Sequence, residues 1–426
     1  MKRKDFLKGT GVLVGGLAVT RDLKGADIGR LLQDAAGRGD EFYWEVIRDQ
    51  FLLDPGWTYL NFGGLGSSPL PVLNSLSEWL RVEERAPSAG YDAKEWAAVK
   101  AKLAPLLGPA CKADDLGLIG GATEGVNMIV NGLDLKKGDE VITSTHEHVS
   151  VNSSLLNRMQ KDGIVIKLFE PDRIRGLGNV DRIAALITSR TRLIIASHVT
   201  CTTGQLLPAK EISQLARSKG LWFALDGAQA PVCVLFDITD IGVDFYTCST
   251  HKWLMGPKRT GFIYVRPGMI DALRPTTVGG GSSKSYDIFK QEIVFHPTAQ
   301  RFEYGTQNDA LFYAMGKACD FVHSVGPERI FKRAHGLAEA FLAGLREIPG
   351  VEILSPEEET YRTCMVGFRM KSKTMNEIND HMAKDKIRVR AVGEGGLNGI
   401  RISFFLCNRP SDVDLALGSL RKLAQA

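Results

Sequence analysis

Residues 221–265 read LWFALDGAQAPVCVLFDITDIGVDFYTCSTHKWLMGPKRTGFIYV, and this stretch decides the fold. Leu221 to Leu225 is a short apolar run, which predicts a strand buried on both faces of a parallel sheet. Asp226 ends that run. A carboxylate at the C-terminal end of a buried parallel strand lies where open α/β sheets bind their ligands. The stretch therefore predicts an α/β fold with a ligand site at this edge of the sheet.

A second apolar run places a lysine at the same edge. Val243 to Cys248 precedes Ser-Thr-His-Lys, whose lysine is Lys252, and Thr260 to Val265 predicts a third strand. Taken alone, Asp226 and Lys252 are more typical of an acidic strand end and a surface lysine than of a binding site. Together they suit pyridoxal phosphate, because a lysine amine with a pKa well below the reference value of ~10.4 forms a Schiff base with the aldehyde. The aspartate would pair with the protonated pyridine nitrogen, which keeps the ring an electron sink.

The sequence of this stretch resembles one family of enzymes. DGAQ at 226–229 followed by STHKWLMGPKRTGFIYV is similar to the fold-type I enzymes of the class V aminotransferase family, which include cysteine desulfurases, isopenicillin N epimerase-like proteins, kynureninases and related C–S lyases. The resemblance extends from about Asn61 to the C-terminus. It implies a pyridoxal phosphate cofactor, a mostly parallel central sheet flanked by helices, and a smaller C-terminal α+β domain. We expect a signal segment at 1–26, a helical segment at 27–60, the large cofactor-binding domain at 61–305, and a linker helix with the small domain at 306–426.

The composition limits the classes of function. The chain has 426 residues, of which 44% are hydrophobic and 24% charged, as in ordinary soluble domains. A net charge of +4 is too small to argue for nucleic acid as a partner, and no apolar run reaches the ~18 residues of a membrane span. The seven cysteines have no C-x-x-C spacing, which favours reduced thiols over a disulfide framework or a zinc site. The two histidines around Glu147 have no further ligands at a suitable spacing, so we expect no metal.

The N-terminus has the layout of an export signal. Lys2-Arg3-Lys4 is basic, and Gly9 to Thr20 is weakly apolar and rich in glycine. Residues 2–8 resemble the twin-arginine pattern with Lys4 in place of the second arginine, and no clear cleavage site follows. We expect an exported, periplasmic protein, with a cytoplasmic enzyme that has a basic N-terminus as the alternative.

The resemblance implies further contacts with the cofactor. Leu116 to Gly121 predicts a strand and a glycine turn that opens a helix, whose free N–H groups suit a phosphate. In the family the corresponding Ala-Thr pair, here Ala122 and Thr123, holds the cofactor phosphate. The segment from Glu147 to Asn152 resembles the one whose histidine stacks on the pyridine ring, and that role falls to His148.

Other expected contacts lie farther along the chain. Gln229 is the candidate for the ring hydroxyl, because Cys201 stands where many relatives have an asparagine. Ser249 and His251 belong to the Ser-x-His-Lys motif and join the expected cofactor-binding residues. The Gly-Thr pair that contains Thr306 reaches, in relatives, the phosphate of the partner subunit's cofactor. This implies a homodimer with active sites at the interface.

Arg401 is the candidate clamp for a substrate carboxylate. It lies in an apolar strand, where a buried arginine needs an anionic partner, and a bidentate guanidinium suits an α-carboxylate. A protein ion pair would explain it equally well, whereas the resemblance places a substrate-binding arginine in this Arg-x-Ser segment. Asn61, in a Leu-Asn pair typical of the family, is expected over the same site.

The sequence specifies the reaction less closely than it specifies the cofactor. SHVTCTTGQLLPAKEI and GIRISFFLCN are most similar to the isopenicillin N epimerase-like branch. Cysteine desulfurases have a nucleophilic cysteine in the loop ahead of the Arg-x-Ser strand, and residues 392–398 contain none, so desulfuration is disfavoured. We expect an enzyme that acts at the α-carbon of an amino acid or amino-acid-like small molecule, as an epimerase, with an aminotransferase and then a C–S lyase as alternatives. A cofactor-free binding protein on the same fold is a further alternative, against which the intact Asp226, Lys252 and His148 argue.

Overall fold

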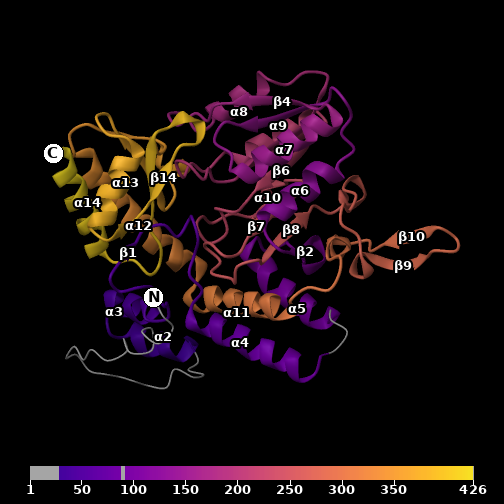
Figure 1. Cartoon of the computed structure of the whole chain (residues 1–426), viewed down its shortest axis with the longest axis horizontal. Helices are drawn as coiled ribbons and strands as arrows, with labels where there is room; N and C mark the ends of the chain where they lie inside the picture. The colour runs from indigo at the N-terminus through magenta and orange to yellow at the C-terminus, as the bar shows by residue number, and fades with distance from the viewer. Residues whose placement is uncertain (1–27, 88–91, 426) are drawn as a thin grey trace, which may run out of the picture.

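A seven-stranded sheet forms the centre of the molecule (Figure 1). The computed structural model describes residues 28–87 and 92–425, so the predicted export signal lies outside the described residues. In spatial order the strands are β2 (Leu116–Ile119), β8 (Gly261–Val265), β7 (Phe245–Ser249), β6 (Trp222–Asp226), β5 (Thr191–Ser197), β3 (Glu140–Ser144) and β4 (Val165–Phe169). Strand β8 runs antiparallel to β2 and β7, and the other neighbours pair in parallel. The predicted, mostly parallel central sheet is confirmed.

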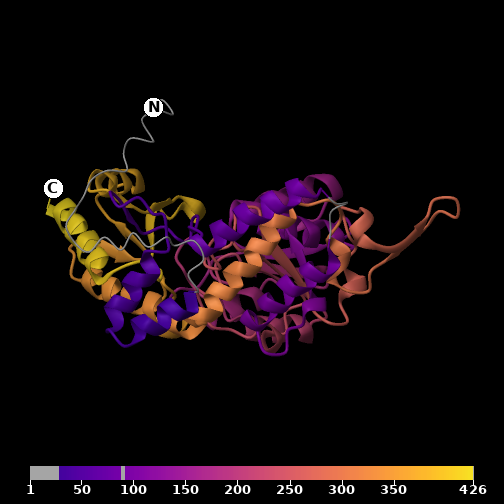
Figure 2. The same cartoon turned by 90° about the horizontal axis from the view of Figure 1, so that it is seen from below.

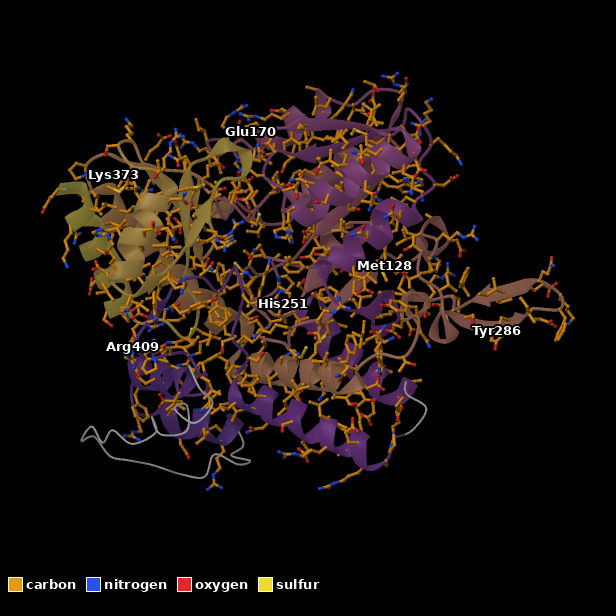
Figure 3. All side chains as sticks on the ribbon, viewed as in Figure 1. Met128, Glu170, His251, Tyr286, Lys373 and Arg409 are labelled. Atoms are coloured by element: carbon orange, nitrogen blue, oxygen red, sulfur yellow. The ribbon has the colours of Figure 1, made fainter. Side chains whose placement is uncertain are left out.

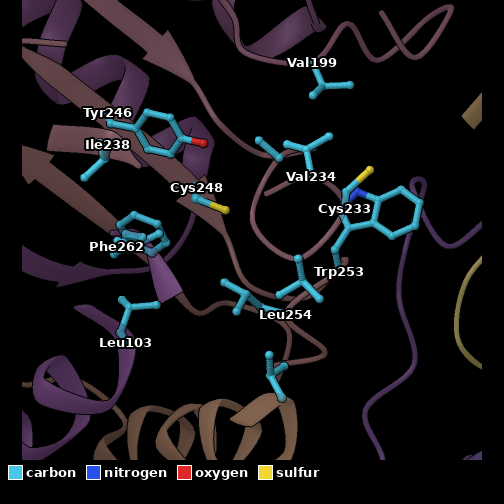
Figure 4. Packing of buried hydrophobic residues seen from close by; sticks show 14 of the residues in the cluster. Leu103, Val199, Cys233, Val234, Ile238, Tyr246, Cys248, Trp253, Leu254 and Phe262 are labelled. Atoms are coloured by element: carbon cyan, nitrogen blue, oxygen red, sulfur yellow. The ribbon is translucent and has the colours of Figure 1, made fainter. Parts of the chain in front are cut away.

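The strands are apolar on both faces because each face carries a separate core. Along β6, Phe223 and Leu225 point into one hydrophobic cluster and Ala224 into another, as the two-residue period of a strand requires. Tyr246 of β7 follows Leu225 into the first cluster, which Figure 4 shows from close by. The helices that flank the sheet are α6 (Ala122–Gly132), α7 (Val149–Asp162), α8 (Gly178–Ala184), α9 (Ala209–Ser218) and α10 (Ile238–Ile241).

Further helices cover the end of the sheet near β2 and β8. Helix α11 (Asp309–Val325) packs along α4 (Leu70–Arg85) and α5 (Ala93–Leu103), and Figure 2 shows it crossing the molecule. Near the start of the described chain, α2 (Ile28–Ala36) packs against α3 (Asp40–Arg48). Short 3₁₀ helices lie at Ala104–Leu106, Ala113–Asp115, Ile270–Ala272, Gly280–Ser282, Ala299–Phe302, Glu359–Tyr361 and Glu394–Gly396.

A second, antiparallel sheet lies in the C-terminal part of the chain, drawn in yellow in Figure 1. Its order is β11 (Val351–Ile353), β12 (Met365–Met370), β15 (Gly399–Ser403) and β14 (Arg390–Val392), with helices α12 (Pro327–Arg346), α13 (Met375–Lys384) and α14 (Pro410–Gln425). Phe341, Phe368 and Ile400 belong to a hydrophobic cluster of its own. This confirms the predicted C-terminal α+β domain, while the residue limits that we predicted for the domains stay a prediction.

The segment 58–66 joins the two sheets. Its strand β1 (Thr58–Tyr59) pairs in parallel with β13 (Ile387–Arg388) beside the small sheet. The amide of Ser403 donates to the carbonyl oxygen of Leu60 at 2.8 Å. At the other end of the segment, the amide of Gly66 donates to the carbonyl oxygen of His251 at 2.8 Å. The segment therefore ties the small sheet to the turn that contains Lys252.

A β-hairpin arm, made of β9 (Ser283–Asp287) and β10 (Glu292–Phe295), projects from the body in both views (Figures 1 and 2). Tyr286, Ile288 and Phe289 on this arm are exposed. A hollow of about 580 Å³ lies along it, away from the sheet edge that ends in Asp226. Within the described ranges, no helix has both the length and the apolarity needed to cross a membrane.

The close packing of segment 58–66 predicts a cost for any added side chain. A Cβ at Gly66 would lie 2.4 Å from the carbonyl oxygen of Lys252. We expect Gly66→Ala to lower the free energy of unfolding by about 1–3 kcal/mol, because overpacking forces the backbone to shift. Gly418→Ala in α14 is the control, since a methyl group there meets no atom within 4 Å. Denaturant unfolding measures both variants, and equal stability of the two would contradict the prediction.

Candidate active site

The candidate acid and lysine lie together at the carboxyl end of the large sheet. Asp226 is the last residue of β6, and Lys252 follows the end of β7 by one turn. Both are buried, and in Figure 3 the neighbouring His251 lies at the centre of the molecule. Burial lowers the pKa of the Lys252 ammonium, and the nearby Asp226 carboxylate opposes that effect. A buried lysine with a lowered pKa is a nucleophile or a base.

Asp226 is held by its neighbours on the sheet. It pairs with Ser197 of β5 and with Thr247 of β7, and one carboxylate oxygen accepts the amide of Ala228 at 2.9 Å. The amide of His198 donates to its carbonyl oxygen at 2.9 Å. The carboxylate therefore has a fixed position beside Lys252.

The start of helix α6 lies next to the end of β7. The amide of Ala122 donates to the hydroxyl oxygen of Ser249 at 2.8 Å. Thr123, in the first helical turn, is exposed. His251 Nδ1 is buried and has no hydrogen-bond partner in the described residues. Burial, with Lys252 next, lowers the pKa of His251 to about 4, so this ring is neutral at neutral pH. The N-terminus of α6, next to Ser249 at the end of β7, is suited to an anion.

His148 begins helix α7 and is fixed by its own helix. Its Nδ1 accepts the amide of Ser150 at 3.2 Å and lies 2.8 Å from the hydroxyl of the same serine. Burial and then Lys252 lower the pKa of His148, while Asp226 raises it. The neutral ring is therefore close to both charged residues. Its stacking on a cofactor ring stays a prediction.

Glu147 is a buried acid that the sequence reasoning missed. Its carboxyl group accepts hydrogen bonds from the hydroxyls of Ser144 at 2.5 Å and Ser197 at 2.6 Å, and from the amide of Ser197 at 3.1 Å. Burial raises the pKa of Glu147 to about 7 against these hydrogen bonds, and Asp226 adds to the rise. The only signal in the sequence was its place beside His148, which does not reveal that it points inward.

Gln229 is engaged by protein groups. Its amide nitrogen donates to the carbonyl oxygen of Gly63 at 2.8 Å, and its amide oxygen accepts the indole N–H of Trp253 at 2.9 Å. These contacts orient the segment 58–66 over the turn that contains Lys252. The role of Gln229 toward a ring hydroxyl stays a prediction.

Arg401 of β15 reaches the same site from the small sheet. One of its terminal nitrogens donates to the carbonyl oxygen of Cys201 at 2.5 Å, and the other to Asn61 Oδ1 at 3.0 Å. It is only 1% exposed, and its Nε has no partner in the described residues. Burial and then Arg390 lower the pKa of Arg401 to about 10. Across residues 28–87 and 92–425 no carboxylate forms an ion pair with Arg401, so the ion-pair explanation lacks a partner.

The structure also places Arg390 and Thr306. Arg390, which the sequence reasoning missed, donates to the carbonyl oxygen of Cys201 at 3.2 Å and pairs with Glu394. Thr306 is exposed in the loop before α11, and its contact with a partner subunit stays a prediction. In the part of the chain that the structure describes, no cluster of His, Cys, Asp and Glu could hold a metal ion.

Comparisons with known proteins find relatives along most of the chain. A family model described as Aminotransferase class-V matches residues 88–416. Isopenicillin N epimerase of Streptomyces clavuligerus is 30% identical over 345 residues, which are 77% of this chain and 84% of that protein. A probable cysteine desulfurase of Methanothermobacter thermautotrophicus is 26% identical over 323 residues, 74% of this chain and 79% of that protein. A C-DES mutant with glycine covalently linked to its PLP cofactor has the same fold, with a TM-score of 0.80 and 23% identity over 88% of this chain and 98% of that one.

The buried Glu147 predicts a pH-dependent stability. Its pKa rises from 4.5 in the unfolded chain to about 7 in the fold. The stability that Glu147 contributes to the fold is therefore fully present below pH 4.5 and is lost as the pH rises through 7. Glu147→Gln removes that loss. We expect the free energy of unfolding of the variant, relative to that of the parent, to rise by on the order of 3 kcal/mol between about pH 5 and pH 8. Denaturant unfolding at both pH values measures it, with Glu352→Gln on the small sheet as control. A pH-independent difference would contradict the prediction.

Proposed function

The chain belongs to the class V aminotransferase family, and on this premise we propose that it acts at the α-carbon of an amino acid or amino-acid-like substrate, in an epimerase-like reaction. Membership makes it a pyridoxal phosphate-dependent enzyme. The observation that carries the proposal is Arg401, a buried guanidinium with no carboxylate partner in the described residues. A buried cation is costly unless an anion pairs with it. The α-carboxylate of a substrate supplies that anion.

The residues at the sheet edge fit pyridoxal phosphate. The N-terminus of α6 suits the phosphate, with Thr123 exposed there and the hydroxyl of Ser249 beside the amide of Ala122. Asp226 suits the pyridine nitrogen, and the buried amine of Lys252 suits the aldehyde. When bound, the cofactor supplies an electron sink for charge that develops at the α-carbon.

Lys252 is the proposed base for the α-proton. Its lowered pKa keeps a larger share of the amine neutral near neutral pH, which is the form that accepts a proton. Arg401 orients the substrate through its carboxylate, and Asn61 in turn holds one arm of the guanidinium. Burial of the site limits water around the α-carbon, so proton transfer there runs through protein side chains.

Epimerisation also needs a proton carrier on the opposite face of the α-carbon, and we propose His148 for this role. The Nδ1 of His148 is engaged by Ser150, so Nε2 is the nitrogen that we propose as the proton carrier. The ring is neutral because burial and Lys252 lower its pKa. In this form it accepts a proton, and it donates one to carbon only from the imidazolium form.

Desulfuration is the second candidate function. The sequence reasoning disfavoured it, but a probable cysteine desulfurase is among the relatives, which makes it a plausible alternative. Against it, all seven cysteines are buried, and burial raises the pKa of Cys201, whose carbonyl oxygen accepts from Arg401, to about 11. Reactive thiols are usually accessible and have a lowered pKa. Transamination shares the first proton transfer and remains the other alternative.

We expect Lys252→Ala to abolish two properties together. The variant should lose the borohydride-reducible covalent link to pyridoxal phosphate. It should also lose deuterium exchange at the α-carbon of amino acids by at least ~100-fold, because general-base catalysis is typically worth that much. Lys258→Ala, an exposed lysine after the same turn, should retain both. Exchange in D₂O, followed by mass spectrometry over a panel of amino acids, identifies the substrate class. A reducible link that persists in Lys252→Ala would remove Lys252 from its role.

We further propose that the protein is a homodimer. The support is the exposed Thr306, together with the exposed apolar side chains of the β-hairpin arm. An isolated two-stranded hairpin is marginally stable in water, so the arm gains from a protein partner. Sedimentation equilibrium of the active enzyme should give twice the chain mass of 46.6 kDa. An active species at the single-chain mass would overturn the dimer.

A further inference from the structure

Two arginines face each other across the edge of the small sheet. The register of β14 and β15 places Arg390 directly opposite Arg401. Both donate to the carbonyl oxygen of Cys201, Arg390 at 3.2 Å and Arg401 at 2.5 Å. Like charges directly opposite each other on a sheet are destabilising. This pair therefore needs negative charge close to it.

Glu394 supplies one negative charge. Its carboxylate forms an ion pair with Arg390, and both side chains are about a quarter exposed. Burial opposes ionisation, but the backbone amide of Glu394 itself and Arg390 together lower the pKa of Glu394, so the group is a carboxylate at neutral pH. The same charge offsets part of the lowering of the pKa values of His148 and Arg401, which places it close to the candidate site.

The position of Glu394 is built into the fold. The next residue, Gly395, has a φ of +61°, which favours glycine. A Cβ there would lie 3.1 Å from Cδ2 of His146, so the loop rests on that ring. His146 is itself held by Thr202 at 3.0 Å and by Glu170 at 3.0 Å. The carboxylate of Glu394 is therefore a fixed feature of the site.

The charges leave room for one more anion. Arg390 and Arg401 contribute two positive charges and Glu394 one negative charge. Over residues 28–87 and 92–425, no other carboxylate pairs with either arginine. One substrate carboxylate makes the cluster neutral, whereas two would leave a net negative charge in a largely buried site.

We infer that Glu394 is a specificity-determining residue, which restricts the enzyme to α-amino acids with a single carboxylate and an uncharged or cationic side chain. Substrates with an acidic side chain, such as aspartate and glutamate, are excluded by repulsion from the Glu394 carboxylate. This inference rests on the proposed function, because it takes Arg401 as the clamp for the α-carboxylate. It adds the side-chain class, which neither the fold nor the family membership specifies.

The test removes the negative charge at position 394. Glu394→Gln gives the empty cluster two net positive charges, so two carboxylates should become the preferred complement. The holoenzyme is titrated in a calorimeter with propionate and with succinate, which have no amine and cannot react. We expect the ratio of succinate to propionate affinity to rise at least tenfold over the parent enzyme. The ratio of kcat/KM for deuterium exchange of L-aspartate over L-alanine should rise likewise.

Two further variants separate charge from structure. Glu352→Gln removes a carboxylate that pairs with Arg369 at 2.9 Å on the same small sheet, and it should leave both ratios unchanged. The double variant Arg390→Gln/Glu394→Gln has one net positive charge again, and it should return to the preference for one carboxylate. A merely structural role of Glu394 would not produce this reversal.

The outcomes distinguish this inference from the proposed function. An unchanged affinity ratio in Glu394→Gln, or a double variant that keeps the altered preference, overturns the specificity role even if the parent exchanges alanine. If the affinity ratios shift as expected but no amino acid exchanges its α-proton, the charge role of Glu394 stands and the proposed function fails. An equal shift in Glu352→Gln would also overturn the inference, because the effect would then not be local.

Discussion

The burial of ionisable groups at the carboxyl end of a parallel sheet is the constraint on which the rest of the structure depends. Lys252, Asp226 and Glu147 are all shielded from water there, and each would be costly without partners. The fold supplies them in different ways. Ser144 and Ser197, at the ends of two neighbouring strands, donate to Glu147. The same burial lowers the pKa of the lysine and makes its amine chemically useful.

Arg401 is a further buried ionisable group, and it comes from the other sheet. The large sheet presents the lysine and the aspartate, but the guanidinium comes from the small sheet and is steadied by Asn61 of segment 58–66. The site is therefore a property of the interface between the two parts. A small rotation of one sheet against the other would change the distance between the base and the clamp. The hydrogen bonds of segment 58–66 to both sides resist such a rotation.

Much of this could be predicted from the sequence, and the exceptions have a physical reason. Apolar runs that end in Asp226 and before Lys252 indicated parallel strands, and the large sheet confirms them. An arginine in an apolar strand indicated an anion at Arg401. Glu147 and Glu394 gave no such signal, because both lie in polar stretches where the direction of a side chain depends on tertiary packing. The partners of Gln229 were hidden for the same reason, since Gly63 and Trp253 meet it only in the folded chain.

The pairing of segment 58–66 has a consequence for the order in which the enzyme is made. This segment leaves the ribosome well before its partners β13 and Ser403, which lie far downstream in the chain. A nascent chain that already contains Asp226 and Lys252 therefore still lacks the cover over them. Until Ser403 emerges, Asn61 has no Arg401 to hold, and the lysine is more open to water. The contacts that join the two sheets over Lys252 therefore form only after β15 has emerged.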